Sequence, residues 1–336
     1  MESFLNRADE TTKDLCLLSK QDVKVLWPTK KDEVCGSQVA HVKAARWFRA
    51  GSWRRWAWTI SFIALAVVTV GALFGVAEHN VELKGATIGS LGFGQVQPAA
   101  IITGGNIESS GSAAQNILAS ILIANTSQTI FSFLYLNLNG LLTSMWLAAE
   151  RSDFEKERKP LRVSRPKGQQ RSTHFLQLPY KVAIPLMVIS GGLHWLISQS
   201  IFPTVLAEYD PSGNLYDAVS IASCGFSPMA MVFVLIAGGF LIAGTILLGF
   251  FSYSGAIPLV GSCSAAISAA CHRPPWDDNA ALKPVKWGVV PEMGDPSGVG
   301  HCTFSSGDVE PLQNGERYAG GTRVRQRECG RDIVTQ

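Results

Sequence analysis

Long stretches without a charged side chain alternate with polar stretches along this 336-residue chain. Asp, Glu, Lys and Arg are absent from residues 56–77, 109–149, 182–207 and 218–272. A helix needs about 20 apolar residues to cross the hydrocarbon core of a bilayer, and each stretch is long enough. The pattern predicts an all-α integral membrane protein, a bundle of about four transmembrane helices with a glycine-rich outer loop and flexible cytoplasmic tails.

We expect a transmembrane region over residues 56–271, with soluble tails on either side. The tails are a basic N-terminal segment, 1–55, and a disordered C-terminal segment, 272–336, rich in proline, glycine and charge. Within the transmembrane region, the expected helices are spans at about 56–77, 116–147, 182–206 and 229–253, then a weak helix at 255–271.

A fifth span over the uncharged residues 85–107 is the rival topology. This stretch holds six glycines and a proline, and each glycine disfavours a helix interior by about 1 kcal/mol. Inserting it would also place the most basic loop of the chain outside the cell. We therefore expect an external or re-entrant loop there.

The distribution of positive charge orients the predicted bundle. Charged residues make up only 16% of the chain, and its mean hydropathy is +0.17. Lys and Arg number eleven up to residue 55, one in 78–115, nine in 150–181, none in 208–228 and eight after residue 253. Cytoplasmic loops of membrane proteins carry the excess of Lys and Arg. Both tails and the loop 150–181 are therefore expected in the cytoplasm, and we favour the plasma membrane over internal membranes.

The loop 150–181 is the first candidate site. Its second part reads "ERKPLRVSRPKGQQRSTHFLQLPYK". Attraction to anionic inner-leaflet lipid is worth about 1 kcal/mol per cation near the surface, whereas few aromatic residues are interleaved to stack on nucleic acid. Phosphorylation of Ser164, Ser172 or Thr173 would weaken such attraction. The candidate headgroup contacts are Arg158, Lys159, Arg162, Arg165, Lys167 and Arg171.

Polar residues inside two predicted spans form the second candidate site. At 100° per residue, five of them follow one face of span two, and three follow one face of span three around the only ionisable side chain well inside a span. This pattern fits hydrogen bonding between helices, and it also fits the wall of a polar or proton path. The residues are Asn125, Gln128, Ser132, Asn139 and Thr143 in span two, and Ser190, His194 and Ser198 in span three.

Enzymatic and metal chemistry are poorly signalled. The seven cysteines form no C-x-x-C pair, and Cys263, Cys271 and His272 match no standard zinc spacing. Arg158 and the pair Arg165-Pro166 resemble part of a lipid-phosphatase cradle, but no histidine nucleophile element follows. We expect no catalytic residue, cofactor or metal.

Several long motifs resemble one family of fungal multi-spanning membrane proteins, catalogued only as a domain of unknown function. The motifs are "GFGQVQP", "ILIANTSQTIFSFLYLNLNGLLTSMWLA", the basic loop, "IPLMVISGGLHWLISQSIF" and "GFSPMA", within about 85–320. The chain departs from the family pattern at Arg151, where Trp is usual, at Ser127, where Pro is usual, and at Pro203, where an aliphatic residue is usual. The resemblance implies a short or N-terminally truncated member, a membrane location and no known activity.

These observations lead to two functional hypotheses. The first is a non-enzymatic sensor, scaffold or membrane organiser whose partners are the bilayer, anionic inner-leaflet lipids or a cytosolic protein, with a homo-oligomer possible and no nucleic acid. The alternative is a small-solute or proton-linked transporter that uses the polar stripe of span two and His194.

Overall fold

The computed structural model describes residues 1–8, 12, 15–17, 19, 22–23, 37–40, 42–101, 113–206, 221–294 and 298–319. The chain divides into two compact units, each described here by itself. The helical unit comprises Trp53–Leu141 and Pro179–Leu247. The composite unit comprises Met1–Ser52, Leu142–Leu178 and Leu248–Gln336, three segments far apart in the sequence.

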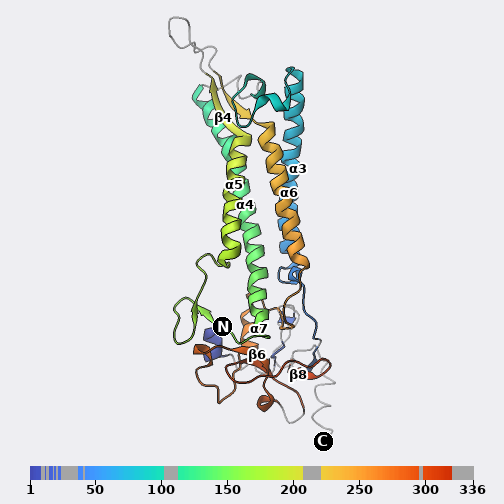
Figure 1. Cartoon of the computed structure of the whole chain (residues 1–336), viewed down its shortest axis with the longest axis vertical. Coiled ribbons are helices and arrows are strands. Elements are labelled where there is room, and N and C mark those ends of the chain that lie inside the picture. Colours follow the sequence, from blue (N-terminus) through green and yellow to red (C-terminus); the bar gives the residue numbers. More distant parts are fainter. Residues whose placement is uncertain are drawn as a thin grey trace. The chain divides into compact units, whose positions relative to one another are not determined.

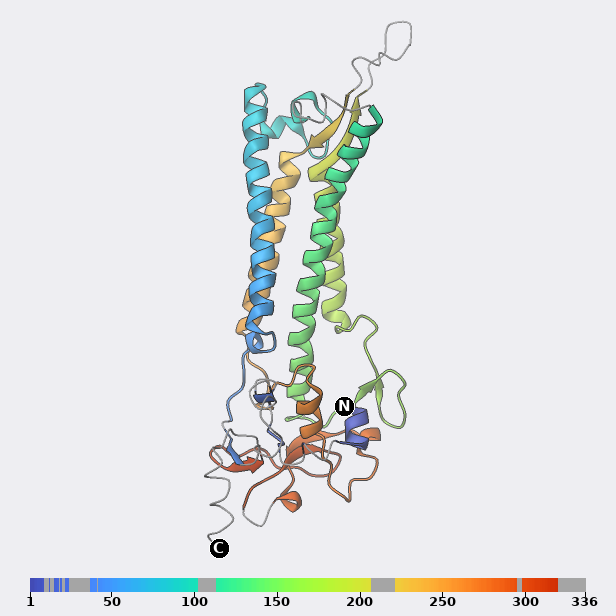
Figure 2. The same ribbon diagram turned by 180° about the vertical axis from the view of Figure 1, so that it is seen from behind.

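Four long helices lie alongside one another in the helical unit (Figures 1 and 2). They are α3 (Trp53–Leu83), α4 (Ala113–Asp153), α5 (Tyr180–Ser200) and α6 (Pro228–Phe250); the last residues of α4 and α6 belong to the composite unit. Among the described residues, these four helices are long and apolar enough to cross a membrane. The prediction of about four such helices is confirmed by length and composition.

The outward surface of these helices is apolar. Large side chains such as Leu65, Val188 and Phe240 are exposed over most of their area. A helix that is hydrophobic on all sides must be covered by something other than water. Lipid chains would cover these side chains at no cost, so the surface agrees with a membrane protein.

The predicted end of span three is wrong. The helix α5 stops at Ser200, and residues 201–206 form the strand β4 (Ile201–Leu206), paired antiparallel with β5 (Ile221–Phe226). Pro203 lies within β4, where it pairs with Cys224. A proline there would remove a helical hydrogen bond, and the β-branched residues around it favour an extended chain.

The glycine-rich segment after α3 forms short turns rather than a membrane-length helix over its described residues, 85–101. Two 3-10 turns, η4 (Ile88–Leu91) and η5 (Pro98–Ala100), occupy it. Gly85, Gly92 and Gly94 have φ values between +63° and +70°, which only glycine adopts readily. The backbone N–H of Gly94 donates to Ser227 Oγ at 3.1 Å, so this segment packs against the start of α6. Residues 102–107 of the rival span lie outside the described residues.

The composite unit is built mainly of short elements. Its helices and turns are α1 (Glu2–Asn6), η3 (Trp47–Arg49), α7 (Ser264–Ala269), η6 (Ala280–Leu282) and η7 (Pro291–Met293). Its described strands form three two-stranded ladders: β1 (Ser37–Val39) with β8 (Arg317–Ala319), β2 (Arg162–Val163) with β3 (Arg171–Ser172), and β6 (Lys286–Val289) with β7 (Cys302–Ser305). The predicted weak helix over 255–271 is reduced to α7.

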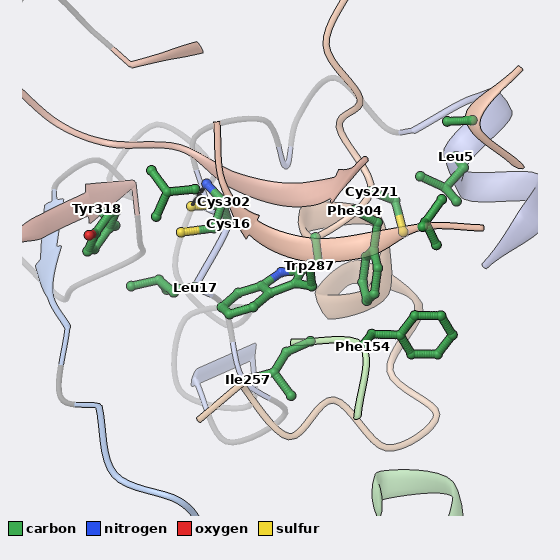
Figure 3. Close-up of a cluster of buried hydrophobic side chains, with 14 of the residues drawn as sticks. Leu5, Cys16, Leu17, Phe154, Ile257, Cys271, Trp287, Cys302, Phe304 and Tyr318 are labelled. Carbon is green, nitrogen blue, oxygen red and sulfur yellow. Dashed lines mark hydrogen bonds between the residues drawn. The ribbon is translucent and has the colours of Figure 1, made fainter. Parts of the chain in front are cut away.

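A hydrophobic core joins the three segments of the composite unit. Trp287 is only 1% exposed and lies in the middle of the cluster, with Phe154 and Phe304 on one side and Cys16 and Leu17 on the other (Figure 3). The prediction of a disordered C-terminal tail is therefore wrong for the described part of 272–319, and the prediction of a flexible N-terminal tail is wrong for the residues that join this core. Both tails bury large apolar side chains, which stabilises a packed structure. Residues 320–336 lie outside the described residues.

Candidate functional site

The first half of the basic loop, residues 150–162, is built into the composite unit. After α4 ends, the backbone of Lys159 exchanges two hydrogen bonds of 2.9 Å with Val285. Trp287 N donates to Phe154 O at 2.9 Å, and the side chains of Phe154 and Leu161 are buried in the core. Packing against the segment before β6 fixes the backbone of this half of the loop.

The cations predicted in this half bind protein atoms. The Arg158 guanidinium donates to the carbonyls of Ser306 and Gly307 and to Asp308 Oδ1, at 2.7 to 3.1 Å. Lys159 Nζ lies 2.7 Å from Asp153 Oδ2, and Arg162 Nε lies 2.8 Å from Glu150 Oε1. The charges of these three cations are therefore engaged by groups of the protein itself.

The second half of the loop is held by its glycine and glutamines. Gln170 is buried; its Nε2 donates to Ala281 O at 2.8 Å, and its Oε1 accepts from Lys167 N at 2.8 Å. Gly168 has a φ of +59°, and a Cβ there would lie 3.0 Å from Leu282 O. Gly168 and the Gln170 side chain therefore fit the loop to η6, whereas Gln169 contributes its backbone N–H, which donates to Leu282 O at 2.9 Å.

Three predicted cations extend from this docked half into solvent. Arg165, Lys167 and Arg171 are exposed, and no described residue pairs with their side chains. Phe175, four residues after Arg171, is 88% exposed. Residues 163–178 contain no Asp or Glu. We call residues 164–175 the basic segment.

Two residues of the predicted polar stripe of span two, Asn125 and Ser132, bond to the backbone of their own helix. The Asn125 side chain is exposed and donates to Ile121 O of its own helix at 2.9 Å. Ser132 Oγ likewise donates to Gln128 O at 3.0 Å. Gln128, Ser132, Asn139 and Thr143 are half-buried. Of the five stripe residues, only Asn125 is exposed, and its amide bonds to its own helix.

The three candidates of span three also fall short of a connected polar site. His194 is half-buried, and its ring lies edge-on to Phe131 of α4, with ring centroids 4.7 Å apart. Ser198 Oγ donates to Trp195 O of its own helix, and Ser190 is half-buried. Among the described residues, His194 has no hydrogen-bond partner. Within the described residues, no hydrogen bond joins His194 to the stripe of span two.

Comparison with known proteins assigns the chain to a family. A family model matches residues 24–320, most of the chain. The chain belongs to the family of the domain of unknown function DUF8419. No curated protein and no solved structure matches it. The predicted resemblance to a family known only by such a domain is thereby confirmed.

The DUF8419 match includes segments of both compact units. It ends one residue after β8, the last described strand, and it contains the basic segment and the η6 turn that holds it. It leaves out Leu5, Cys16 and Leu17, which are nevertheless buried in the core of the composite unit. Apolar residues that precede the region matched to DUF8419 therefore contribute to the hydrophobic core of the composite unit.

Buried polar groups of the composite unit were missed from the sequence. Arg151 is 9% exposed, with its guanidinium carbon 5.3 Å from the centre of the Phe304 ring. Asp277 is 2% exposed, and its carboxylate accepts hydrogen bonds from Ser306 N and from the hydroxyls of Ser305 and Ser306. Burial alone would raise the pKa of Asp277, but these hydrogen bonds outweigh it and leave the pKa below its usual value. No sequence motif marks either residue.

Cys16, Cys271 and Cys302 of the composite unit are buried free thiols, whereas Cys263 is half-buried. Burial raises the pKa of Cys271 to about 11, although the nearby Arg151 charge opposes the shift. A hydrogen bond with Cys16, together with burial, raises the pKa of Cys302. His272 Nε2 lies 3.0 Å from Thr12 Oγ1. Within the described residues, no group of three or more His, Cys, Asp or Glu side chains could hold a metal ion.

Proposed function

We propose that this DUF8419 protein is a non-enzymatic, multi-pass membrane protein of fungal origin that acts as a sensor, scaffold or organiser at the plasma membrane. Its basic loop, 150–181, would engage anionic lipid of the inner leaflet. The observation that carries the proposal is the basic segment, where exposed cations are presented on a docked backbone without a neighbouring acid in the sequence. Its fungal origin rests on the family resemblance.

The topology behind this proposal rests on charge and on the number of long apolar helices. With four crossings, both ends of the chain and the loop 150–181 share one side of the membrane. That side then holds 28 of the 29 Lys and Arg residues, all except Lys84. The cytoplasmic leaflet carries a negative surface potential that attracts such basic segments.

The transport alternative is less well supported by the contacts. A polar path needs side chains that face a common interior, but Asn125 and Ser132 satisfy themselves on their own helix. His194 contacts an aromatic ring rather than a polar neighbour. We therefore favour the membrane-organising role.

Cysteine accessibility of the full chain in cells tests the topology. Ser164→Cys places a thiol in the basic segment, and Val96→Cys places a matched, exposed thiol in the predicted outer loop. We expect a membrane-impermeant maleimide to label Val96→Cys in intact cells and Ser164→Cys only after permeabilisation. Labelling of Ser164→Cys in intact cells would overturn the proposal. The unsubstituted chain serves as the background control.

A further inference from the structure

The charges of the basic loop divide into two groups of different character. Residues 150–157 contain four acids, and the described contacts engage each of them. Glu150 binds Arg162, Asp153 and Glu157 bind Lys159, and Glu155 accepts a hydrogen bond from Ile257 N at 2.8 Å. The positive charge of this half is used mainly within the protein.

The basic segment has the opposite arrangement. Its three cations are exposed, and no described residue neutralises them. Its only large hydrophobic side chain that is exposed is Phe175. A cationic surface with one exposed aromatic ring fits the boundary between lipid headgroups and acyl chains, where cations meet phosphates and aromatic rings are enriched.

The backbone of the basic segment is fixed at both ends before any ligand arrives. Arg171 N donates to Leu161 O at 2.9 Å and Thr173 N to Val163 O at 3.2 Å, which closes the ladder of β2 and β3. In the turn between β2 and β3, Gln169 N donates to Leu282 O at 2.9 Å, and Gln170 Nε2 donates to Ala281 O. A loop ordered in advance loses less conformational entropy on binding.

Chain connectivity favours a lipid over another anionic partner. Phe175 is only five residues before Tyr180, where the membrane-length helix α5 begins. Five residues span at most about 18 Å when fully extended. If α5 crosses the membrane, the exposed ring cannot lie far from the headgroups, whereas a peptide or nucleic acid would have to compete with a lipid surface already in place.

We propose that Arg165, Lys167 and Arg171 form a preordered surface for the phosphate groups of anionic lipids, with Phe175 entering the interface beside them. Arg158, Lys159 and Arg162 serve the internal structure instead. This assignment rests on the proposed function and names the part of the loop that performs it. It also explains why Gly168 and Gln170 occur within an otherwise basic stretch: they hold the surface in place.

Binding of short-chain lipids to the full-length protein in neutral detergent tests the assignment. The probes are dioctanoyl phosphatidylserine, dioctanoyl phosphatidylcholine and inorganic phosphate. The wild-type chain is expected to bind the serine lipid in preference to the choline lipid, with an affinity that falls as salt is raised. Without this preference, the lipid part of the proposed function fails.

Two triple variants with the same loss of charge then locate the surface. We expect Arg165→Gln with Lys167→Gln and Arg171→Gln to weaken binding of the serine lipid on the order of a hundred-fold, since each cation contributes roughly five-fold. We expect Arg158→Gln with Lys159→Gln and Arg162→Gln to change it less than about five-fold while lowering thermal stability. Equal losses in the two variants would overturn the assignment and leave general attraction of the loop intact.

Single variants keep the test decisive if a triple variant fails to fold. Lys167→Gln and Lys156→Gln each remove one exposed lysine, inside and outside the basic segment. Only Lys167→Gln should weaken lipid binding, by about five-fold. Phe175→Ala should weaken binding of the lipid but leave binding of inorganic phosphate unchanged. Inorganic phosphate that binds as tightly as the serine lipid would show a site for free phosphate and overturn the lipid assignment.

Discussion

A guanidinium lies buried in the composite unit at position 151. Arg151 stacks on Phe304, but its Nε and Nη2 have no hydrogen-bond partner among the described residues. A buried donor left unsatisfied costs about 1–3 kcal/mol, and replacing buried charges by apolar residues of similar volume is often stabilising. The family resemblance leads us to expect Trp here, so the charge is not required for the fold.

Replacing this arginine is therefore expected to stabilise the composite unit. Arg151→Met should raise the midpoint of thermal unfolding by several degrees, since 1 kcal/mol corresponds to about 2–4 °C in a unit of this size. The midpoint can be followed by maleimide labelling of the buried Cys271, with modified peptides identified by mass spectrometry. Arg158→Met is the control, because it removes bonds to the 306–308 turn and should lower the midpoint. A lower midpoint for Arg151→Met would show that its charge has a partner.

Asp277 carries a pH dependence with a definite sign. Its pKa is lowered in the folded state, so its stabilising effect is present above the unfolded pKa of about 3.9 and disappears as pH falls through the folded value. Asp277→Ala leaves Ser306 N and the Ser305 hydroxyl without their acceptor, which should cost about 1–3 kcal/mol near neutral pH.

The difference between wild type and Asp277→Ala should therefore begin to shrink near the unfolded pKa of about 3.9 and continue to shrink as pH falls through the lower folded pKa. Thermal midpoints of the two chains across the acid range measure this. Asp278→Ala is the matched control, because its exposed ion pair with Arg273 contributes little. A difference between wild type and Asp277→Ala that stays constant down to pH 2 would contradict the assigned role.

The six candidate headgroup cations illustrate what single residues reveal in a sequence. Their type and number were readable, because a run of Lys and Arg beside an apolar stretch has a direct electrostatic meaning. The sequence did not show which of these cations are left free to bind a ligand. The Arg158 guanidinium donates to a turn almost 150 residues later in the chain, and the Gln170 side chain fixes its loop by donating to Ala281 O. Such partners become neighbours only in the folded chain.

At the scale of elements, membrane-length helices were the most predictable feature and short strands the least. Continuous apolar sequence over 20 residues has few alternatives. The strands β6 and β7 are four residues each and almost entirely buried, so they lack the alternation of apolar and polar residues that marks a half-exposed strand. Proline and glycine around them favoured the incorrect prediction of a disordered tail.

The helix pair α4 and α5 allows a direct test of the transport alternative. Since His194 contacts Phe131 and has no described hydrogen bond, His194→Leu should preserve expression and change the thermal midpoint by less than about 3 °C, within the usual range for replacement by an apolar residue. Ser198→Ala is the control for a neighbouring residue that bonds only to its own helix. Loss of a proton-dependent flux in a folded His194→Leu variant would instead favour the transporter.

At the scale of the whole molecule, the composite unit is assembled from the N-terminal segment, the basic loop and the C-terminal segment. Leu17 N and Cys16 Sγ both bond to Ala319 O, at 3.1 and 3.0 Å, and β1 pairs with β8. The N-terminal segment of this unit is therefore joined to the C-terminal segment through β8, the last described strand. A segment classed by composition as a tail completes the core that holds the basic loop.

Chains shortened from the C-terminal side should show this dependence in steps. A chain ending at residue 319 keeps every described contact, and Cys16 and Cys271 should resist maleimide as in the full chain. Ending at residue 314 removes β8 and should expose Cys16 alone, while ending at 284 removes Trp287 and Phe304 and should expose both. Peptide mass spectrometry after a brief maleimide pulse distinguishes the two thiols. Protection of both thiols in the chain ending at 284 would mean that the residues after 284 are dispensable for this core.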